Sequence, residues 1–194
     1  MSNALQNLLK TTETFTAAEG RACGVAPSLL AYYVKTGLLE RVSRGVYRNL
    51  KKDPSTPMEW ANLVATVDSV PTGVVCLISA LVIYEMTEEF PEEHWIAVPR
   101  GQWRPKRKNT RVIWLTNMKL GLTKIKIGKK SIPIFNRERT VVDAFRLLPI
   151  ETAIKALKIY LTSTESHNPD LRRLNAYANK LRFDISPYVM ALTT

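Results

Sequence analysis

The chain has 194 residues, enough for one domain or two small ones with a real hydrophobic core. Its 28 Lys and Arg outnumber its 17 Asp and Glu, so the net charge is +11 at pH 7. Such a balance favours an anionic partner, and it says nothing about the fold. The longest nearly apolar run, Val74 to Tyr84, is too short to span a bilayer, and the first ten residues lack the apolar segment of a secretory signal. We therefore expect a cytoplasmic protein without a membrane partner, in which Cys23 and Cys76 are reduced core residues.

The first fifty residues contain three predicted helices. Leucines at helical spacing predict a helix over residues 2–10. Thr16 and Glu19 have the spacing of a capping box, so a second helix of about two turns should follow over 17–23. Pro27 suits the first position of a third helix, which should run to Thr36 before Gly37 ends it.

The third helix should bury Leu30, Tyr33 and Val34, which fall at i, i+3 and i+4. After it, two strands are predicted over 39–42 and 46–48, around a turn with Gly45 where positive φ is easiest. This order is that of a winged helix-turn-helix, whose second helix enters the major groove. The residues predicted to contact DNA are Ser28, Ala31, Tyr32 and Lys35 at base edges, and Arg41, Arg44 and Arg48 at phosphates. The alternative is a small helical domain with a solvated basic turn.

Residues 51–57 are rich in charge, Pro and Ser, and read as a linker. We expect an α+β protein with a winged helix-turn-helix domain over 1–50 and a mixed α/β domain over 57–194. In the second domain, helices should start near Pro57 and by Ser79, and a short strand should cover Trp95 to Pro99. Ser79 is interpreted as a packing residue, and the acidic loop at 88–94 as a solvated loop rather than a metal site.

The charge of the chain is concentrated between residues 100 and 130, which hold eleven basic residues and no acid. Strands are predicted over 111–115 and 122–127, with a basic loop over 104–108. We expect this segment to contact a polyanion or an acidic protein; a solvated strand face is the alternative. The predicted patch comprises Arg100, Arg104, Lys106, Arg107, Lys108, Arg111, Lys124, Lys126, Lys129 and Lys130.

The remaining chain is predicted to be mainly helical. After a strand over 131–135, Asn136 should cap a helix over 137–146, along which Arg139, Asp143 and Arg146 form an ion-pair ladder. Further helices are expected over 150–162, from a start at Asn168-Pro169-Asp170 with Asn168 as the N-cap, and from Asp184 or Ser186 up to residue 191.

The stretch FTAAEGRACGVAPSLLAYYVKTGLLERVSRGVYR (15–48) resembles the N-terminal winged-helix domain of the AbiEi-type antitoxins, and its best-matching piece is 37–48. These are the transcriptional-repressor halves of type IV toxin–antitoxin systems of bacterial abortive infection, a phage defence. The string ERTVVD (138–143) and Ser79-Ala80-Leu81 are similar to their second domain. One departure is Ala26-Pro27, where the family more often has Ser followed by a basic residue. The resemblance implies autoregulation by binding inverted repeats upstream of the operon. It also implies a nucleotidyltransferase-like toxin, with or without a stable complex.

Enzyme chemistry has little support in the sequence. Only two histidines are present, and neither belongs to a Ser-His-Asp or Cys-His motif. A phosphate loop and zinc-ligand spacing are also missing. We expect no catalytic activity, no metal and no cofactor. The alternative to a DNA-reading antitoxin is a protein- or RNA-interacting module that neutralises the toxin through segment 100–130.

Overall fold

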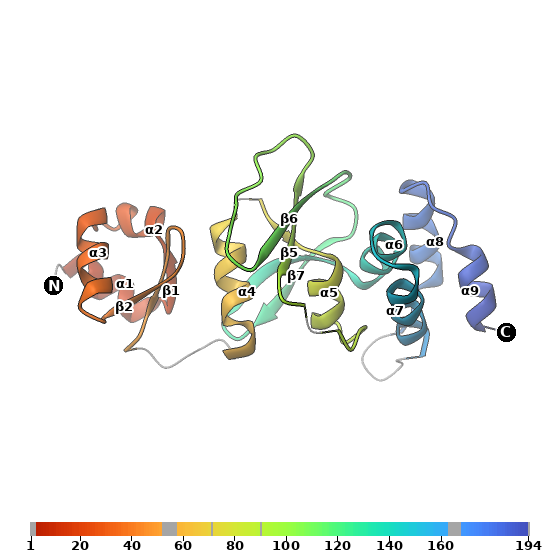
Figure 1. Ribbon diagram of the computed structural model, residues 1–194, viewed down its shortest axis with the longest axis horizontal. Helices are drawn as coiled ribbons and strands as arrows, with labels where there is room; N and C mark the ends of the chain where they lie inside the picture. The colour runs from red at the N-terminus through yellow and green to blue at the C-terminus, as the bar shows by residue number, and fades with distance from the viewer. Residues whose placement is uncertain (1–2, 52–57, 71, 90, 163–167, 194) are drawn as a thin grey trace. The chain divides into compact units, whose positions relative to one another are not determined.

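The computed structural model describes residues 3–51, 58–70, 72–89, 91–162 and 168–193 (Figure 1). The fold is a mixture of helices and sheets, which confirms the predicted α+β class. Two compact units are present. The first comprises residues 1–71 and 126–132, and the second comprises residues 72–125 and 133–194. The predicted linker at 51–57 lies outside the described residues except for Lys51, and the predicted domain boundary stays a prediction.

The first unit begins with three helices and a three-stranded sheet. Its elements are α1 (Asn3–Thr11), β1 (Thr14–Thr16), α2 (Ala17–Ala22), α3 (Pro27–Lys35), β2 (Leu39–Ser43), β3 (Val46–Asn49) and α4 (Met58–Ser69). The predicted capping box is confirmed, because the Glu19 amide donates to the Thr16 hydroxyl (3.1 Å) and the Thr16 amide donates to the Glu19 carboxylate (2.6 Å). Gly37, with φ +72°, follows α3 as expected.

The sheet of the first unit has the strand order β1-β3-β2, all antiparallel. Strand β1 was not predicted, because three residues between two helices carry no periodic signal. It pairs Phe15 with Tyr47, and the two rings stack with their centroids 5.8 Å apart. The turn of the β2–β3 hairpin is tied to α2, because the Ala17 amide donates to the Gly45 carbonyl (2.7 Å). This bond places the basic turn next to the start of α2.

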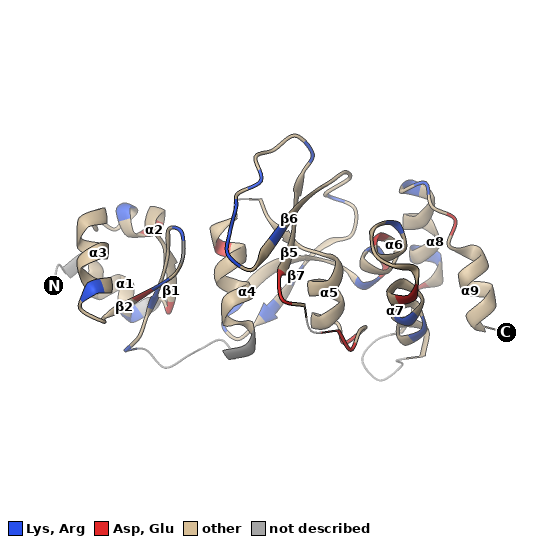
Figure 2. Cartoon of the chain, in the orientation of Figure 1, with Lys and Arg blue, Asp and Glu red and all other residues tan. Residues whose placement is uncertain are grey.

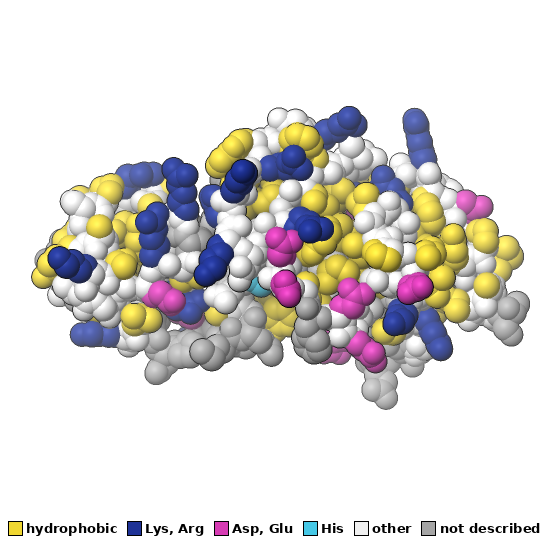
Figure 3. All heavy atoms as spheres, in the orientation of Figure 1, with side chains coloured by type: hydrophobic (Ala, Val, Ile, Leu, Met, Phe, Trp, Pro, Cys, Tyr) yellow, Lys and Arg dark blue, Asp and Glu magenta, His cyan; other side chains and the backbone are white. Residues whose placement is uncertain are grey.

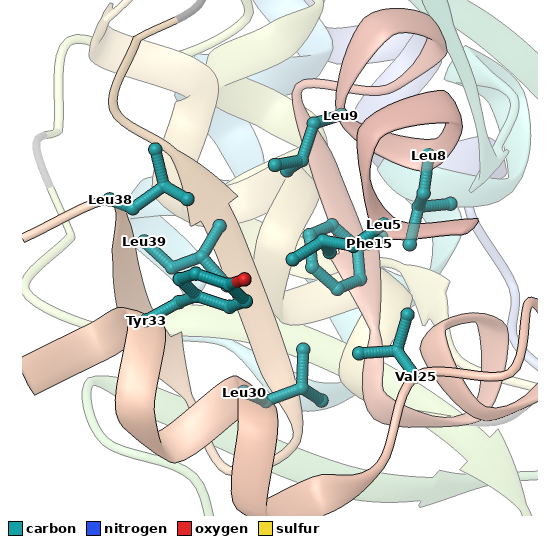
Figure 4. Packing of buried hydrophobic residues seen from close by; sticks show 9 residues of the cluster. All are labelled: Leu5, Leu8, Leu9, Phe15, Val25, Leu30, Tyr33, Leu38 and Leu39. Atoms are coloured by element: carbon teal, nitrogen blue, oxygen red, sulfur yellow. The ribbon is translucent and has the colours of Figure 1, made fainter. Parts of the chain in front are cut away.

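The core of the first unit joins α1, α3 and the sheet (Figure 4). Its buried side chains point toward one another around Phe15, and they are Leu5, Leu8, Leu9, Val25, Leu30, Tyr33, Leu38 and Leu39. The expected burial of Leu30 and Tyr33 is confirmed, whereas Val34 is half-buried at the margin of this core. Helix α4 packs against all three strands. The opposite side of α3 is left uncovered by this core.

The second unit holds a five-stranded sheet of order β6-β5-β4-β8-β7 and five helices among the described residues. Its elements are β4 (Val74–Val75), α5 (Leu77–Ile83), β5 (His94–Pro99), β6 (Thr110–Leu115), β7 (Leu122–Ile127), β8 (Lys130–Phe135), α6 (Arg137–Leu147), α7 (Ile150–Thr162), α8 (Leu171–Lys180) and α9 (Ser186–Thr193). Strand β4 is antiparallel to β5 and parallel to β8, while β5 and β6 are parallel. Residues 126–132, which are the end of β7, the turn after it and the start of β8, are grouped with the first unit.

The helices of the second unit pack in sequence on one another. Helix α5 contacts β5, α6 contacts α5, both α7 and α8 contact α6, and α9 contacts α7. Asn136 caps α6 as predicted, accepting from the Arg139 amide (3.1 Å). The predicted start of α8 is wrong by two residues: Asp170 is the cap, accepting from the Arg173 amide (2.9 Å).

One cysteine also differs from the prediction. Cys76 is buried beside α5, whereas Cys23 is exposed just after α2. The helix ends at Ala22, and Cys23 carries the turn out to Gly24, so the side chain does not reach the core. Both thiols are free.

Candidate nucleic-acid interface

The uncovered side of α3 carries the residues predicted to approach bases. Ser28, Ala31, Tyr32 and Lys35 are all exposed, and residue Tyr32 is 57% accessible. They share one face because the opposite face supplies Leu30 and Tyr33 to the core. The edge of the Tyr32 ring meets Tyr33, with centroids 5.3 Å apart. This contact ties the largest exposed side chain of α3 to the core.

The chemistry of this face is polar rather than charged. Lys35, in the last turn, is the single cation among the four residues. The Ser28 and Tyr32 hydroxyls can each donate and accept a hydrogen bond, and the Ala31 methyl can contact a thymine methyl. The face can therefore read base edges, while most of the phosphate neutralisation has to come from other elements.

The β2–β3 hairpin supplies three arginines, and the structure does not bring all of them together. Arg41 and Arg44 are exposed. Arg41 lies opposite Tyr47, whereas Arg48 lies opposite Glu40, so Arg41 and Arg48 are on different faces of the sheet. Arg48 is half-buried and pairs with Glu40 (3.4 Å), and two of its nitrogens are buried without a hydrogen-bond partner. Its geometry is that of a residue held against the sheet rather than one free to follow a phosphate.

The basic segment 100–130 falls into both units. Lys126, Lys129 and Lys130 belong to the first unit, and the cations from Arg100 to Lys124 belong to the second. Figure 2 shows the Lys and Arg of the chain in blue. Lys130 is half-buried and forms an ion pair with Asp68. Burial raises the pKa of the Asp68 carboxyl, and the neighbouring Lys130 partly opposes this rise. These residues were predicted to form one patch because they are close in sequence. Closeness in sequence does not reveal that they belong to two different units.

The loop between β5 and β6 combines cations with exposed aromatic rings. Within the second unit, it and β6 carry Arg100, Arg104, Lys106, Arg107, Lys108 and Arg111. Trp103 is 73% accessible and Trp114 is 47% accessible. The Arg104 guanidinium lies 4.0 Å from the centre of the Trp114 ring, and the Trp114 indole donates to the Gln102 carbonyl (2.7 Å). Figure 3 shows hydrophobic and basic side chains side by side over this part of the molecule. Such a surface offers both stacking faces and phosphate contacts.

The predicted ladder on α6 exists, and it is buried rather than solvated. Arg139 is fully inaccessible, and Asp143 is 1% accessible. Asp143 accepts from Arg139 Nε and from Arg146 Nη1, both at 2.6 Å. The remaining Arg139 nitrogens donate to the carbonyls of Thr116 (3.2 Å), Asn117 (3.0 Å) and Leu120 (3.1 Å). The few tenths of a kcal/mol typical of exposed i, i+4 pairs therefore do not apply here.

These carbonyl contacts are the feature that the sequence least revealed. The spacing of Arg139, Asp143 and Arg146 predicts the pairs along the helix. The loop from Thr116 to Gly121 lies some twenty residues earlier, and nothing in its sequence marks it as an acceptor. Only the packing of α6 beside this loop brings the two together.

Other polar groups have ordinary structural partners. The Ser79 hydroxyl is buried and accepts from the Trp95 amide (2.8 Å), which supports its interpretation as a packing residue. Within the described part of the chain, His, Cys, Asp and Glu do not gather in groups of three that could hold a metal ion. Among the helices of these same residues, none has the length and apolar character needed to span a membrane.

Comparison with known proteins agrees with the resemblance of the N-terminal segment. Residues 3–49 match the model of the family described as "Transcriptional regulator, AbiEi antitoxin". The match covers α1 to β3, the part of the first unit that carries α3 and the hairpin. No curated protein matches the chain significantly.

Proposed function

Because residues 3–49 match the AbiEi family of antitoxin transcriptional regulators, we propose that this protein is a DNA-binding repressor and antitoxin of a type IV toxin–antitoxin system. It would act in the cytoplasm and bind inverted repeats upstream of its own operon. The first unit would be a winged helix-turn-helix, with α2 and α3 as the motif and the β2–β3 hairpin as the wing. The cognate toxin would be nucleotidyltransferase-like, and neutralisation need not involve a stable complex.

The observation that carries this proposal is the exposed face of α3 together with an exposed basic turn in the same unit, held at the start of α2. The core takes Leu30 and Tyr33 from the other face, and Ser28, Ala31, Tyr32 and Lys35 stay accessible. A helix of this kind fits the major groove, which is wide enough to admit it. Arg44, at the hairpin tip, is then available for the backbone alongside.

Helix α3 and the β2–β3 hairpin are expected to contribute differently to DNA binding, because they differ in charge. Helix α3 would discriminate sequence through the Ser28 and Tyr32 hydroxyls, while Arg41 and Arg44 would supply salt-dependent affinity. Arg48 is expected to contribute less, because it is already paired with Glu40. Removing Arg44 should therefore weaken binding to all duplexes alike, and removing Tyr32 should act mainly on the native operator.

The test is fluorescence anisotropy of the full chain with duplex DNA from its own upstream region, against a scrambled duplex, over a salt series. We expect a preference for the native duplex that persists as salt rises. Arg44→Ala should cost on the order of 1 kcal/mol and flatten the salt slope by about one unit. Arg172→Ala, an exposed cation on α8, is the matched control and should change neither. Unchanged affinity and slope in Arg44→Ala would remove the wing from the proposal.

A second candidate function is supported by the β5–β6 loop. Its exposed Trp103 and its cations suit single-stranded RNA, whose bases stack on aromatic rings. On this alternative the protein would neutralise its toxin as an RNA- or protein-binding module without reading DNA. Equal, steeply salt-dependent binding to native and scrambled duplexes would favour it. Loss of RNA binding in Trp103→Ala, with DNA binding intact, would support it directly.

A further inference from the structure

A hollow on the second unit is surrounded by cations. Its lining residues are Thr116, Asn117, Arg146, Lys180, Leu181 and Arg182, and we call it the basic pocket. A second hollow shares Asn117 and Lys180 and adds Lys119 and Leu120. The basic pocket measures about 340 Å³, at the lower end of the range for small-molecule sites. Its lining residues lie at the ends of β6, α6 and α8, and none of them belongs to the Trp103 loop.

The charge of the basic pocket is positive even after its ion pair is counted. Arg139, Asp143 and Arg146 together carry one net positive charge, because Asp143 serves both arginines. Lys180 and Arg182 raise this to three, and Lys119 in the adjoining hollow raises it to four. Neither hollow has a carboxylate among its lining residues. Asp184, two residues after Arg182, accepts from the Ser186 amide (3.0 Å) at the start of α9 and is not among the lining residues of either hollow.

The walls of the basic pocket are held in place before any ligand arrives. Buried Arg139 anchors the carbonyls of Thr116 and Asn117, so the loop that forms one wall is tied to α6. Asp143, 1% accessible, holds Arg146, another lining residue, at 2.6 Å. Two residues of α6, Arg139 and Asp143, thus orient one loop and one cation of the same pocket. Pre-organised donors bind an anion without having to order first.

Arg182 occupies a backbone position that normally belongs to glycine. Helix α8 ends in a Schellman motif, in which the Phe183 amide donates to the Ala178 carbonyl (3.0 Å) and the Arg182 amide to that of Asn179 (3.1 Å). Arg182 is the residue with positive φ, +57°. Most residues pay a conformational cost there that glycine does not. A strained backbone residue that carries a charge into a pocket is a reason to look for a ligand.

From these observations we propose that the basic pocket is a binding site for a phosphate group. Lys180 and Arg182 supply charge from α8, Arg146 supplies a guanidinium oriented by Asp143, and Thr116 and Asn117 supply uncharged donors. The phosphate belongs either to a free phosphorylated small molecule or to a nucleic-acid backbone, whose oxyanion chemistry is the same. The site is independent of DNA reading by the first unit.

The experiment is isothermal titration calorimetry of the full chain with inorganic pyrophosphate, in a buffer that contains a metal chelator. The titration is then repeated in the presence of a short single-stranded oligonucleotide as a competitor. We expect saturable binding that Lys180→Ala and Arg182→Gly each weaken about tenfold or more, the usual loss for a charged hydrogen bond. The control Arg172→Ala, also on α8, should bind as the wild type does. Competition by the oligonucleotide would assign the site to a nucleic-acid backbone, and its failure would assign it to a small phosphorylated ligand.

Arg182→Gly separates binding from folding. Because glycine relieves the positive φ, this variant should unfold at a higher urea concentration than the wild type while it binds pyrophosphate less well. Either of two results would overturn the proposal: no saturable binding by the wild type, or an equal loss in Arg172→Ala and Arg182→Gly. The second result would show that pyrophosphate responds to net charge alone.

Discussion

The buried carboxylate of Asp143 offers the sharpest test of the structure. Asp143→Ala removes the partner of both Arg139 and Arg146, and it leaves the fully inaccessible Arg139 with backbone carbonyls alone. Breaking a buried pair from one side costs about 3–5 kcal/mol, because a charge stays buried without compensation. An exposed i, i+4 pair is worth about 0.3–0.5 kcal/mol. The two interpretations of the ladder thus differ roughly tenfold in the expected loss.

The assay is urea unfolding followed by tryptophan emission, with midpoints and slopes compared between variants. Glu93→Ala is the matched control within the same unit. It breaks the exposed pair of Glu93 with Arg111 (3.0 Å) and should cost less than about 1 kcal/mol. A loss below about 1 kcal/mol in Asp143→Ala would refute the reasoning, since it would mean that water reaches the Arg139 guanidinium once the carboxylate is gone.

Two further predictions concern a steric clash at Gly121 and the pH dependence of stability. Gly121→Ala should destabilise the protein by more than Gly101→Ala, because both glycines have positive φ but a Cβ at Gly121 would lie 2.6 Å from the Arg139 Cβ, whereas nothing lies near Gly101. Equal urea midpoints for the two variants would contradict that contact. Burial lowers the pKa of His94 below its usual 6.5, so the unfolded chain takes up a proton at a higher pH than the folded chain. The contribution of His94 is therefore complete above pH 6.5 and is lost as the pH falls through the folded pKa. His94→Gln should shrink the drop in urea midpoint between about pH 7 and about pH 5, and an undiminished drop would assign it to other groups.

Local signals predicted most of the helices and strands. The capping box at Thr16, Gly37 after α3 and Asn136 before α6 act within three or four residues, so their spacing was sufficient. Short-range spacing was insufficient where two polar residues compete for the same role. At the start of α8, both Asn168 and Asp170 can cap, and the structure uses Asp170.

The sequence predicted which residues of the candidate site are exposed on α3 better than it predicted how the arginines of the hairpin are arranged. The exposed face of α3 follows from helical periodicity, because burying Leu30 and Tyr33 turns Ser28 and Tyr32 outward. The position of Arg48 does not follow in the same way. Its pairing with Glu40 depends on the register of β2 with β3, which a hairpin sequence only partly specifies.

By itself, the sequence determined the order of most elements, the α+β class and the resemblance of its first fifty residues to the AbiEi family, because these depend on spacing and motifs along the chain. The tertiary structure alone decided which charges act together. Segment 100–130 is continuous in sequence yet is divided between two units, whereas Arg146 and Arg182 are far apart in sequence and line one pocket. The physical reason is that burial and electrostatic coupling depend on distance through space, which packing sets and residue number does not.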